Sequence, residues 1–219
     1  IEGLHFHCLC ENDSSSLAHT LEHVEKRFGH LLDKIRWLNM GGGHLITREG
    51  YDIQLLTKTL QTFKKKHPQL ELIIEPGSAF LWQTGYLISR VIDIVENHHM
   101  KTAILNVSFT CHMPDCLEMP YLPEVKGARI ATDMPPTGKN TYRLGGNSCL
   151  SGDFMGYWIF EKPLKIGDEI IFEDMTHYTT VKTNMFNGIN HPAIVIKHLD
   201  HEFELLRLYT YEDYKQRMD

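Results

Sequence analysis

The stretch IRWLNMGGG, residues 35–43, decides the fold class of this chain. An apolar run that ends in three consecutive glycines is typical of a buried strand followed by a tight turn. Shorter apolar stretches on either side of it, at residues 3–9 and 70–74, also predict strands. Two amphipathic patterns separate these strands. They predict one helix after the N-cap residues 12–16 and a second helix that ends at His67-Pro68.

The apolar stripes of both helices have the three- and four-residue spacing of a helix that buries one face. In the first helix the stripe is Leu17, Leu21, Val24, Phe28, Leu31 and Ile35. In the second helix it is Ile53, Leu56, Leu60 and Phe63. The order strand, helix, strand, helix, strand is that of consecutive βαβ units, which make parallel strands.

Three strands and two helices are too few to close an eight-stranded barrel and make a poor open sheet alone. Parallel strands need cover on both faces. The chain also begins with Ile1, immediately before a stretch that already reads as a strand. We therefore expect further strands upstream, and expect this chain to be the carboxyl part of a longer protein.

The remainder of the chain, residues 85–219, has a different pattern. Short β-branched and aromatic stretches are separated by turn residues such as Gly167-Asp168 and Asn187-Gly188. The stretches are residues 86–95, 102–107, 142–144, 157–160, 169–172, 193–196 and 203–208. They predict an antiparallel sheet domain, which a short polar helix at residues 211–217 closes.

Composition narrows the function classes. The chain has 219 residues, a formal net charge of −6 and a pI of about 6.2, which argues against non-specific nucleic-acid binding. No apolar run approaches the ~20 residues of a membrane helix. The five cysteines are odd in number, so we do not expect a disulfide framework. We expect the protein to lie in a reducing cytoplasm instead.

Polar residues and glycines follow each predicted parallel strand, at the end where such folds gather their chemistry. They are His7, the glycines 41–43, and Glu75 with Gly77. Three glycines expose consecutive backbone N–H groups, which suits a phosphate, although they also fit a simple tight turn. Glu75 suits a protonated ring nitrogen. His7 fits a core histidine as well as a ligand contact.

Two segments of the second half also carry candidate chemistry. The loop at residues 145–153 places Cys149 and Asp153 among small residues. It indicates either a close approach to a ligand or a structural turn with a buried thiol. Tyr178, in the segment 172–179, is either a packed aromatic or a phenol that donates to a phosphate.

These segments, in this order, resemble the fold-type III pyridoxal-phosphate decarboxylases, which include the ornithine and diaminopimelate enzymes. The resemblance covers nearly the whole chain. It implies that residues 1–84 are the C-terminal part of a cofactor-binding (β/α)8 barrel and that residues 85–219 are a β domain. The implied cofactor is pyridoxal 5'-phosphate. The residues implied to hold it are His7, Gly41, Gly42, Gly43, Glu75, Gly77 and Tyr178.

Residues 111–121 and 147–153 look most like the carboxynorspermidine and carboxyspermidine decarboxylase branch of that superfamily. Leu150 stands where ornithine-type enzymes have aspartate and diaminopimelate-type enzymes have glutamate. Ser78 stands where the family has arginine. The implied reaction makes norspermidine or spermidine in polyamine biosynthesis, in a homodimer whose subunits share active sites.

The same resemblance implies that Cys149, presented by a second subunit, is the proton donor. It implies further that the cationic substrate tail meets acidic residues. The implied substrate contacts are Glu75, Asp115, Glu118 and Asp153, with Asp115 preferred for the tail and Glu118 the alternative. The family's Schiff-base lysine is expected upstream of Ile1, so we expect this chain alone to be inactive or nearly so.

Two other functions remain open at the level of sequence. His5 and His7 have metal-ligand spacing on a strand, and Cys8 and Cys10 add possible ligands, which would fit a metal-dependent barrel hydrolase. That function needs further ligands at later strand ends. A decarboxylase-like regulatory protein without catalysis is the other alternative, although it would have no need of a positioned thiol at Cys149.

Overall fold

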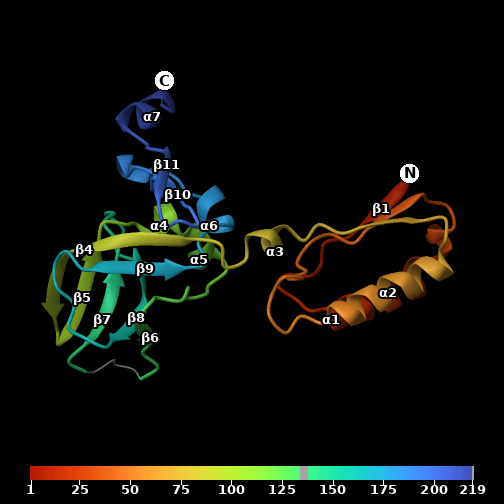
Figure 1. Ribbon diagram of the computed structural model, residues 1–219, viewed down its shortest axis with the longest axis horizontal. Helices are drawn as coiled ribbons and strands as arrows, with labels where there is room; N and C mark the ends of the chain where they lie inside the picture. The colour runs from red at the N-terminus through yellow and green to blue at the C-terminus, as the bar shows by residue number, and fades with distance from the viewer. Residues whose placement is uncertain (134–137, 219) are drawn as a thin grey trace. The chain divides into compact units, whose positions relative to one another are not determined.

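The computed structural model describes residues 1–133 and 138–218 (Figure 1). Contacts within the chain divide it into two compact units, Ile1–Trp82 and Gln83–Asp219. The division falls two residues before the boundary expected from the sequence. Among the helices of the described ranges, none is long and apolar enough to cross a membrane.

The first unit is a three-stranded parallel sheet with the order β1-β2-β3. Its elements are β1 (Gly3–His5), α1 (Ser14–Leu32), β2 (Trp37–Asn39), α2 (Ile53–Lys66), β3 (Glu71–Ile73) and α3 (Gly77–Leu81). In Figure 1 the helices α1 and α2 lie side by side. The predicted order of strands and helices and the parallel pairing of the strands are thus confirmed.

The core of this unit forms where the helix stripes meet the sheet. Leu17 and Leu21 of α1 and Phe63 of α2 are buried in one cluster with Leu38 of β2. The stripe predicted for the first helix is wrong at Phe28, which is 50% exposed because no part of the described chain covers that turn. It is also too long, because α1 ends at Leu32 and Ile35 lies beyond it.

The second unit holds a six-stranded sheet with the order β6-β8-β7-β5-β4-β9. Its strands are β4 (Tyr86–Asn97), β5 (Met100–Leu105), β6 (Ala128–Ile130), β7 (Thr141–Gly145), β8 (Phe154–Phe160) and β9 (Glu169–Glu173). Four of its five strand pairs are antiparallel, as predicted, but β5 and β7 run parallel. The expectation of a purely antiparallel sheet is wrong there. The chain leaves β5 through two short helices and β6 and returns in the same direction, as parallel strands require.

Large side chains fill the core of this sheet domain. Trp158, Phe109 and Phe172 are almost completely buried, and the rings of Phe109 and Phe172 meet edge to face. Phe109 begins α4 (Phe109–His112), which is followed by α5 (Pro114–Glu118). Both short helices therefore pack against this core, α4 through Phe109 and α5 through Cys116.

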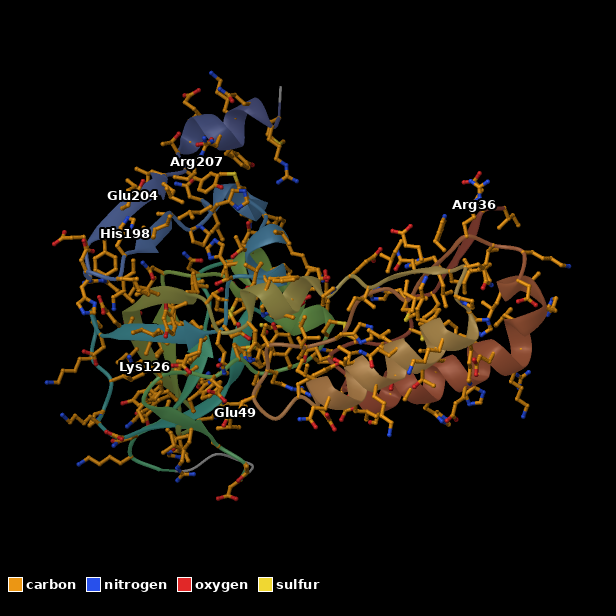
Figure 2. All side chains as sticks on the ribbon, turned by 45° about the vertical axis from the view of Figure 1, so that its right-hand side comes forward. Arg36, Glu49, Lys126, His198, Glu204 and Arg207 are labelled. Atoms are coloured by element: carbon orange, nitrogen blue, oxygen red, sulfur yellow. The ribbon has the colours of Figure 1, made fainter. Side chains whose placement is uncertain are left out.

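The last segment forms an antiparallel ribbon of β10 (Ile194–Lys197) and β11 (Phe203–Arg207), which pairs with no other strand in the described ranges. It follows α6 (Tyr178–Val181) and a 3-10 turn at Phe186–Gly188, and it precedes α7 (Tyr211–Gln216). Figure 2 labels His198 and Glu204, which are 2.9 Å apart at the turn end of the ribbon. All nine strand residues of the ribbon are exposed.

Candidate functional site

The parallel strands of the first unit bring three predicted segments together at one sheet edge. The backbone N–H of Phe6 donates to the Asn39 carbonyl over 3.0 Å, and that of Glu75 donates to the Gly41 carbonyl over 2.8 Å. The chain leaving each strand is therefore tied to the chain leaving its neighbour. His7, the glycine loop 41–43 and Glu75 lie at this edge, as the strand order predicts.

The glycine loop lies too close to its neighbours to accept side chains. A Cβ atom on Gly42 would lie 2.6 Å from the Glu75 carbonyl oxygen. Gly43 has a φ of +87°, in the left-handed region that favours glycine, and a Cβ atom there would lie 2.2 Å from the Leu9 carbonyl oxygen. The neighbouring backbone therefore leaves room only for glycine in this loop. As a result, no side chain of the loop covers its backbone N–H groups.

His7 is exposed, so the interpretation as a core histidine is wrong. Its Nδ1 atom accepts a hydrogen bond from the Gly42 backbone N–H over 3.1 Å. A ring nitrogen that accepts a hydrogen bond carries no proton, so the neutral ring carries its proton on Nε2. The imidazole is therefore oriented by the glycine loop.

The Glu75 side chain is exposed, and its partner is a residue that the sequence analysis did not identify. Asn39, the last residue of β2, donates from Nδ2 to Glu75 Oε1 over 2.6 Å and accepts from the Gly41 N–H at Oδ1 over 2.9 Å. One amide thus joins the carboxylate to the glycine loop. Gly77 follows on the same chain, and its N–H donates to the Glu75 carbonyl over 2.8 Å.

His44, directly after the glycines, is a second residue that the sequence analysis missed. It is 1% exposed, and neither ring nitrogen has a hydrogen-bond partner within the described residues. Burial lowers the pKa of His44, because the buried ring has no water to stabilise its charged form. His44 is thus a neutral imidazole with unused hydrogen-bonding capacity beside the loop.

These residues fit pyridoxal phosphate by their chemistry. The loop offers N–H groups that no side chain shields, which suits a phosphate. His7 offers an oriented aromatic face, and Glu75 offers a carboxylate for a protonated ring nitrogen. The orphaned ring nitrogens of His44 fit a site that gains a polar partner when a ligand binds.

In the second unit, Cys149 lies exposed in the loop between β7 and β8. The alternative of a buried structural thiol is therefore wrong. The Asn187 amide donates from Nδ2 to the Cys149 sulfur over 2.9 Å. Asn187 has a φ of +57° and sits in the 3-10 turn after α6, so it reaches the thiol from a distant part of the chain. No local sequence pattern indicates this contact, because Asn187 and Cys149 are 38 positions apart.

Asp153 anchors the loop that carries Cys149. Its side chain is nearly buried and accepts backbone N–H groups of Phe109 over 2.7 Å, Thr110 over 3.2 Å and Ser148 over 3.0 Å. Both carboxylate oxygens therefore already bind the protein. A contact between Asp153 and substrate remains a prediction, and it would require one of these bonds to change.

The two acidic residues predicted for the substrate tail share one cation of the chain itself. Lys182 Nζ lies 2.7 Å from Asp115 Oδ1 and 2.9 Å from Glu118 Oε2. These bonds raise the pKa of Lys182 above its usual range. Asp115 is buried, whereas the Glu118 side chain is 61% exposed. Glu118 therefore keeps the more accessible charge.

Tyr178 opens α6 and is 51% exposed, so it is not a packed core aromatic. Lys182 Nζ lies 5.6 Å from the centre of its ring, within the range of a cation–π contact. The predicted phosphate-binding phenol and the predicted acidic residues therefore occupy one neighbourhood of the second unit.

The described residues give no support to a metal centre. Within residues 1–133 and 138–218, no group of three or more His, Cys, Asp and Glu side chains is placed to hold a metal ion.

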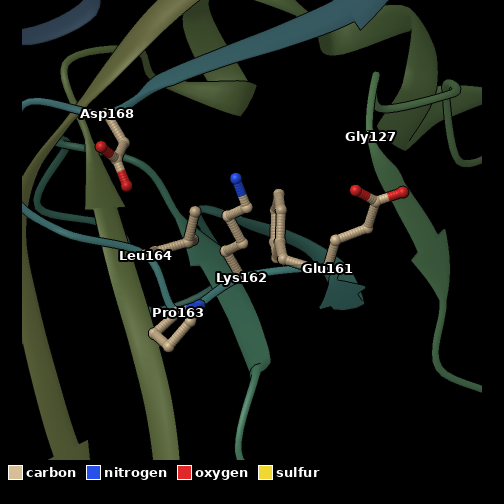
Figure 3. A pocket seen from close by; sticks show the side chains of 7 residues that line it. Gly127, Glu161, Lys162, Pro163, Leu164 and Asp168 are labelled. Carbon is tan, nitrogen blue, oxygen red and sulfur yellow. The ribbon is translucent and has the colours of Figure 1, made fainter.

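The second unit also has a surface cavity of roughly 230 Å³ (Figure 3). It is lined by Gly127, Phe160, Glu161, Lys162, Pro163, Leu164 and Asp168. None of the predicted site residues lines it.

Comparison with known proteins gives concordant matches. Residues 16–176 match the family model described as pyridoxal-dependent decarboxylase, C-terminal sheet domain. The chain is 54% identical over 218 residues to the carboxyaminopropylagmatine decarboxylase of Synechocystis sp., covering 100% of this chain and 55% of that protein. It is 42% identical to the carboxynorspermidine/carboxyspermidine decarboxylase of Campylobacter jejuni, covering 99% of this chain and 58% of the relative.

A solved structure gives the same match. The crystal structure of the Campylobacter jejuni carboxynorspermidine decarboxylase, complexed with norspermidine, superposes with a TM-score of 0.90 at 43% identity. The match covers 99% of this chain and 60% of that chain. The present chain thus spans little more than half the length of the relatives it matches.

Proposed function

The chain belongs to the pyridoxal-dependent decarboxylases, and we propose that it is part of an enzyme that decarboxylates a carboxylated polyamine. The proposed substrates are carboxynorspermidine and carboxyspermidine, with carboxyaminopropylagmatine as a third because a relative with 54% identity is named for it. The observation that carries the proposal is the shared strand edge, where the glycine loop, His7 and Glu75 are tied together.

Pyridoxal phosphate, when bound, supplies an electron sink for the pair of electrons left behind when carbon dioxide departs. Glu75 would hold a negative charge at the ring nitrogen and so keep that nitrogen protonated. His7, oriented by Gly42, would support one face of the ring. The N–H groups of the loop 41–43 and the phenol of Tyr178 would bind the phosphate.

Cys149 is the proposed proton donor. Loss of carbon dioxide leaves an electron pair on carbon, and one proton must replace the carboxyl group there. An exposed thiol that already accepts the Asn187 amide is fixed in position for that transfer. Asp153, through its three backbone partners, holds the loop that presents the thiol.

The cationic end of the substrate is proposed to meet Glu118, with Asp115 behind it. Lys182 already balances one of these two charges. The site thus keeps about one net negative charge, which suits a single distal ammonium or guanidinium group. The sequence predicted Asp115 as the preferred contact and Glu118 as the alternative; we propose the reverse order, because Asp115 is buried and paired with Lys182 whereas Glu118 is exposed.

We further propose the fold of the first unit, the oligomeric state of the enzyme and the place where it acts. The first unit is part of a (β/α)8 barrel, supported by its parallel strands and two covering helices. The enzyme is a homodimer that shares its sites, and it acts in the cytoplasm. The exposed Cys149 favours an enzyme over a non-catalytic regulator.

The test uses the full-length protein with pyridoxal phosphate and measures carbon dioxide released from the three carboxylated amines, ornithine and diaminopimelate. We expect kcat/KM for at least one carboxylated amine to exceed that for ornithine and diaminopimelate at least about tenfold. Glu75→Ala and Cys149→Ala should cut turnover while leaving the fold intact. Preference for diaminopimelate, or turnover that needs a metal instead of the cofactor, would overturn the proposal.

A further inference from the structure

Asn39 occupies the centre of the strand edge, between two groups that the proposed function uses. Its side chain is half-buried at the end of β2 and makes two hydrogen bonds, to Gly41 and to Glu75. These contacts cross from one strand end to the next, because Glu75 follows β3. A surface asparagine with a local turn role would not make such a bridge.

The two bonds fix which way the amide points. A backbone N–H can only donate, so the Gly41 N–H requires the carbonyl oxygen of Asn39. The NH2 group must then face Glu75, and it binds Oε1 over 2.6 Å. The other oxygen, Oε2, has no hydrogen bond to the described residues, so the amide selects which carboxylate oxygen remains available.

The donor at Oε1 is neutral, and this matters for the charge of the site. A hydrogen bond from an amide adds no positive charge to the carboxylate that accepts it. An arginine or lysine in the same place would neutralise the carboxylate. With Asn39 as donor, the whole negative charge of Glu75 stays available for a cationic ring nitrogen.

We propose that Asn39 is a positioning residue that presents Oε2 of an ionised Glu75 to the cofactor ring nitrogen, and at the same time sets the glycine loop through Gly41. This inference rests on the proposed function. Asn39 does not itself touch the reacting atoms. Its effect passes through Glu75, so substitutions of the two residues must not be independent.

The test measures turnover and the visible absorbance of the bound cofactor in the full-length protein across pH 6–9. Asn39→Ala should lower kcat by about tenfold or more, change KM little, and alter the pH dependence of the cofactor absorbance. In a Glu75→Gln background, Asn39→Ala should lower kcat by less than about twofold further.

Asn39→Asp guards against a purely structural effect, because it retains an oxygen for the Gly41 N–H. The aspartate, with an ordinary pKa of about 4, is ionised throughout pH 6–9, so it cannot donate to Glu75 and repels it. This variant should therefore lose kcat by about tenfold or more, as Asn39→Ala does, although it keeps the acceptor for Gly41. Gln61→Glu, at an exposed position of α2, adds the same charge to the same unit and should leave turnover and spectrum unchanged.

Two results would overturn the inference. One is a wild-type spectrum and kcat in Asn39→Ala. The other is an equal loss from Asn39→Ala with and without Glu75. Failure of the wild-type protein to bind the cofactor or to decarboxylate any of the amines is a different result, which would overturn the proposed function together with this inference.

Discussion

Backbone and amide N–H groups, rather than cations, hold two of the carboxylates in the candidate site. Asp153 accepts three backbone N–H groups and Glu75 accepts one side-chain amide. Such bonds bring no positive charge, so they leave the charge of the carboxylate unbalanced. Asp115 differs, because Lys182 pairs with it directly. Asp153 and Glu75 are thus held in position without a cation, whereas the charge of Asp115 is neutralised by Lys182.

Cys116 gives a pH prediction at the same scale. Burial raises its pKa from the ordinary 9.0 to about 11. Unfolding releases the thiol to its ordinary value, so the folded state binds this proton more tightly. The stabilisation is complete below pH 9 and is lost as pH rises towards about 11. Between pH 9 and 10, we expect this thiol to lower the free energy of unfolding by about 1 kcal/mol.

Urea denaturation of the protein and of Cys116→Ser between pH 8 and 10 checks this prediction. The serine variant should lose the part of the pH slope that belongs to the thiol, whatever its stability at pH 8. Tyr121 beside it also has a raised pKa, so the comparison stops at pH 10, the ordinary value for tyrosine. Equal slopes in the two proteins would contradict the assignment.

The sequence identified most of the candidate residues but not their partners. Glycines and a glutamate after strands are local signals, and the strand order places them at one edge. Asn39 had a usable signal, since it is a polar residue two positions before the glycines. Lys182 had none, because its ion pair with Asp115 joins residues 67 positions apart. His44 could not be recognised as unpaired without its surroundings.

At the element scale, Lys182 ties α6 to α5. It follows α6, and its two partners lie on α5. Removing the ammonium would leave the buried Asp115 without its cation, since the Tyr121 hydroxyl at 3.3 Å is its remaining side-chain partner in the described residues. We expect Lys182→Met to lower the melting temperature, because an uncompensated buried charge is costly.

A double-mutant cycle with Asp115→Asn separates this pair from general effects. The double variant should lose less stability than the sum of the single variants, since each single substitution breaks the same interaction. Lys162→Met removes an exposed lysine elsewhere in the unit and should leave the melting temperature nearly unchanged. Additive losses in the cycle would show that Lys182 does not act through Asp115.

The helices α1 and α2 were predictable from the spacing of their apolar residues. The strands β1 to β3 have only three residues each, but they lie in apolar stretches that alternate with these two helices. The strand β6 and the helices α3 to α6 are equally short and have no such context, so no periodicity marks them. The parallel pairing of β5 with β7 depends on the path of the intervening chain, so local pattern could not reveal it.

At the scale of the whole molecule, each unit has a core of its own. One is centred on α1, α2 and the parallel sheet, and the other on the six-stranded sheet. The family match runs across both units, from residue 16 to residue 176. The predicted site residues are likewise divided between the units, with the cofactor-holding edge in the first and the thiol and acidic residues in the second.

The most direct test is a crystal structure of the full-length protein with pyridoxal phosphate bound. The ring nitrogen should lie within hydrogen-bonding distance of Glu75 Oε2, the phosphate should lie among residues 41–43, and His7 should face the ring. A cofactor bound elsewhere, or a ring nitrogen that faces a neutral side chain while Glu75 points away, would contradict the central claim.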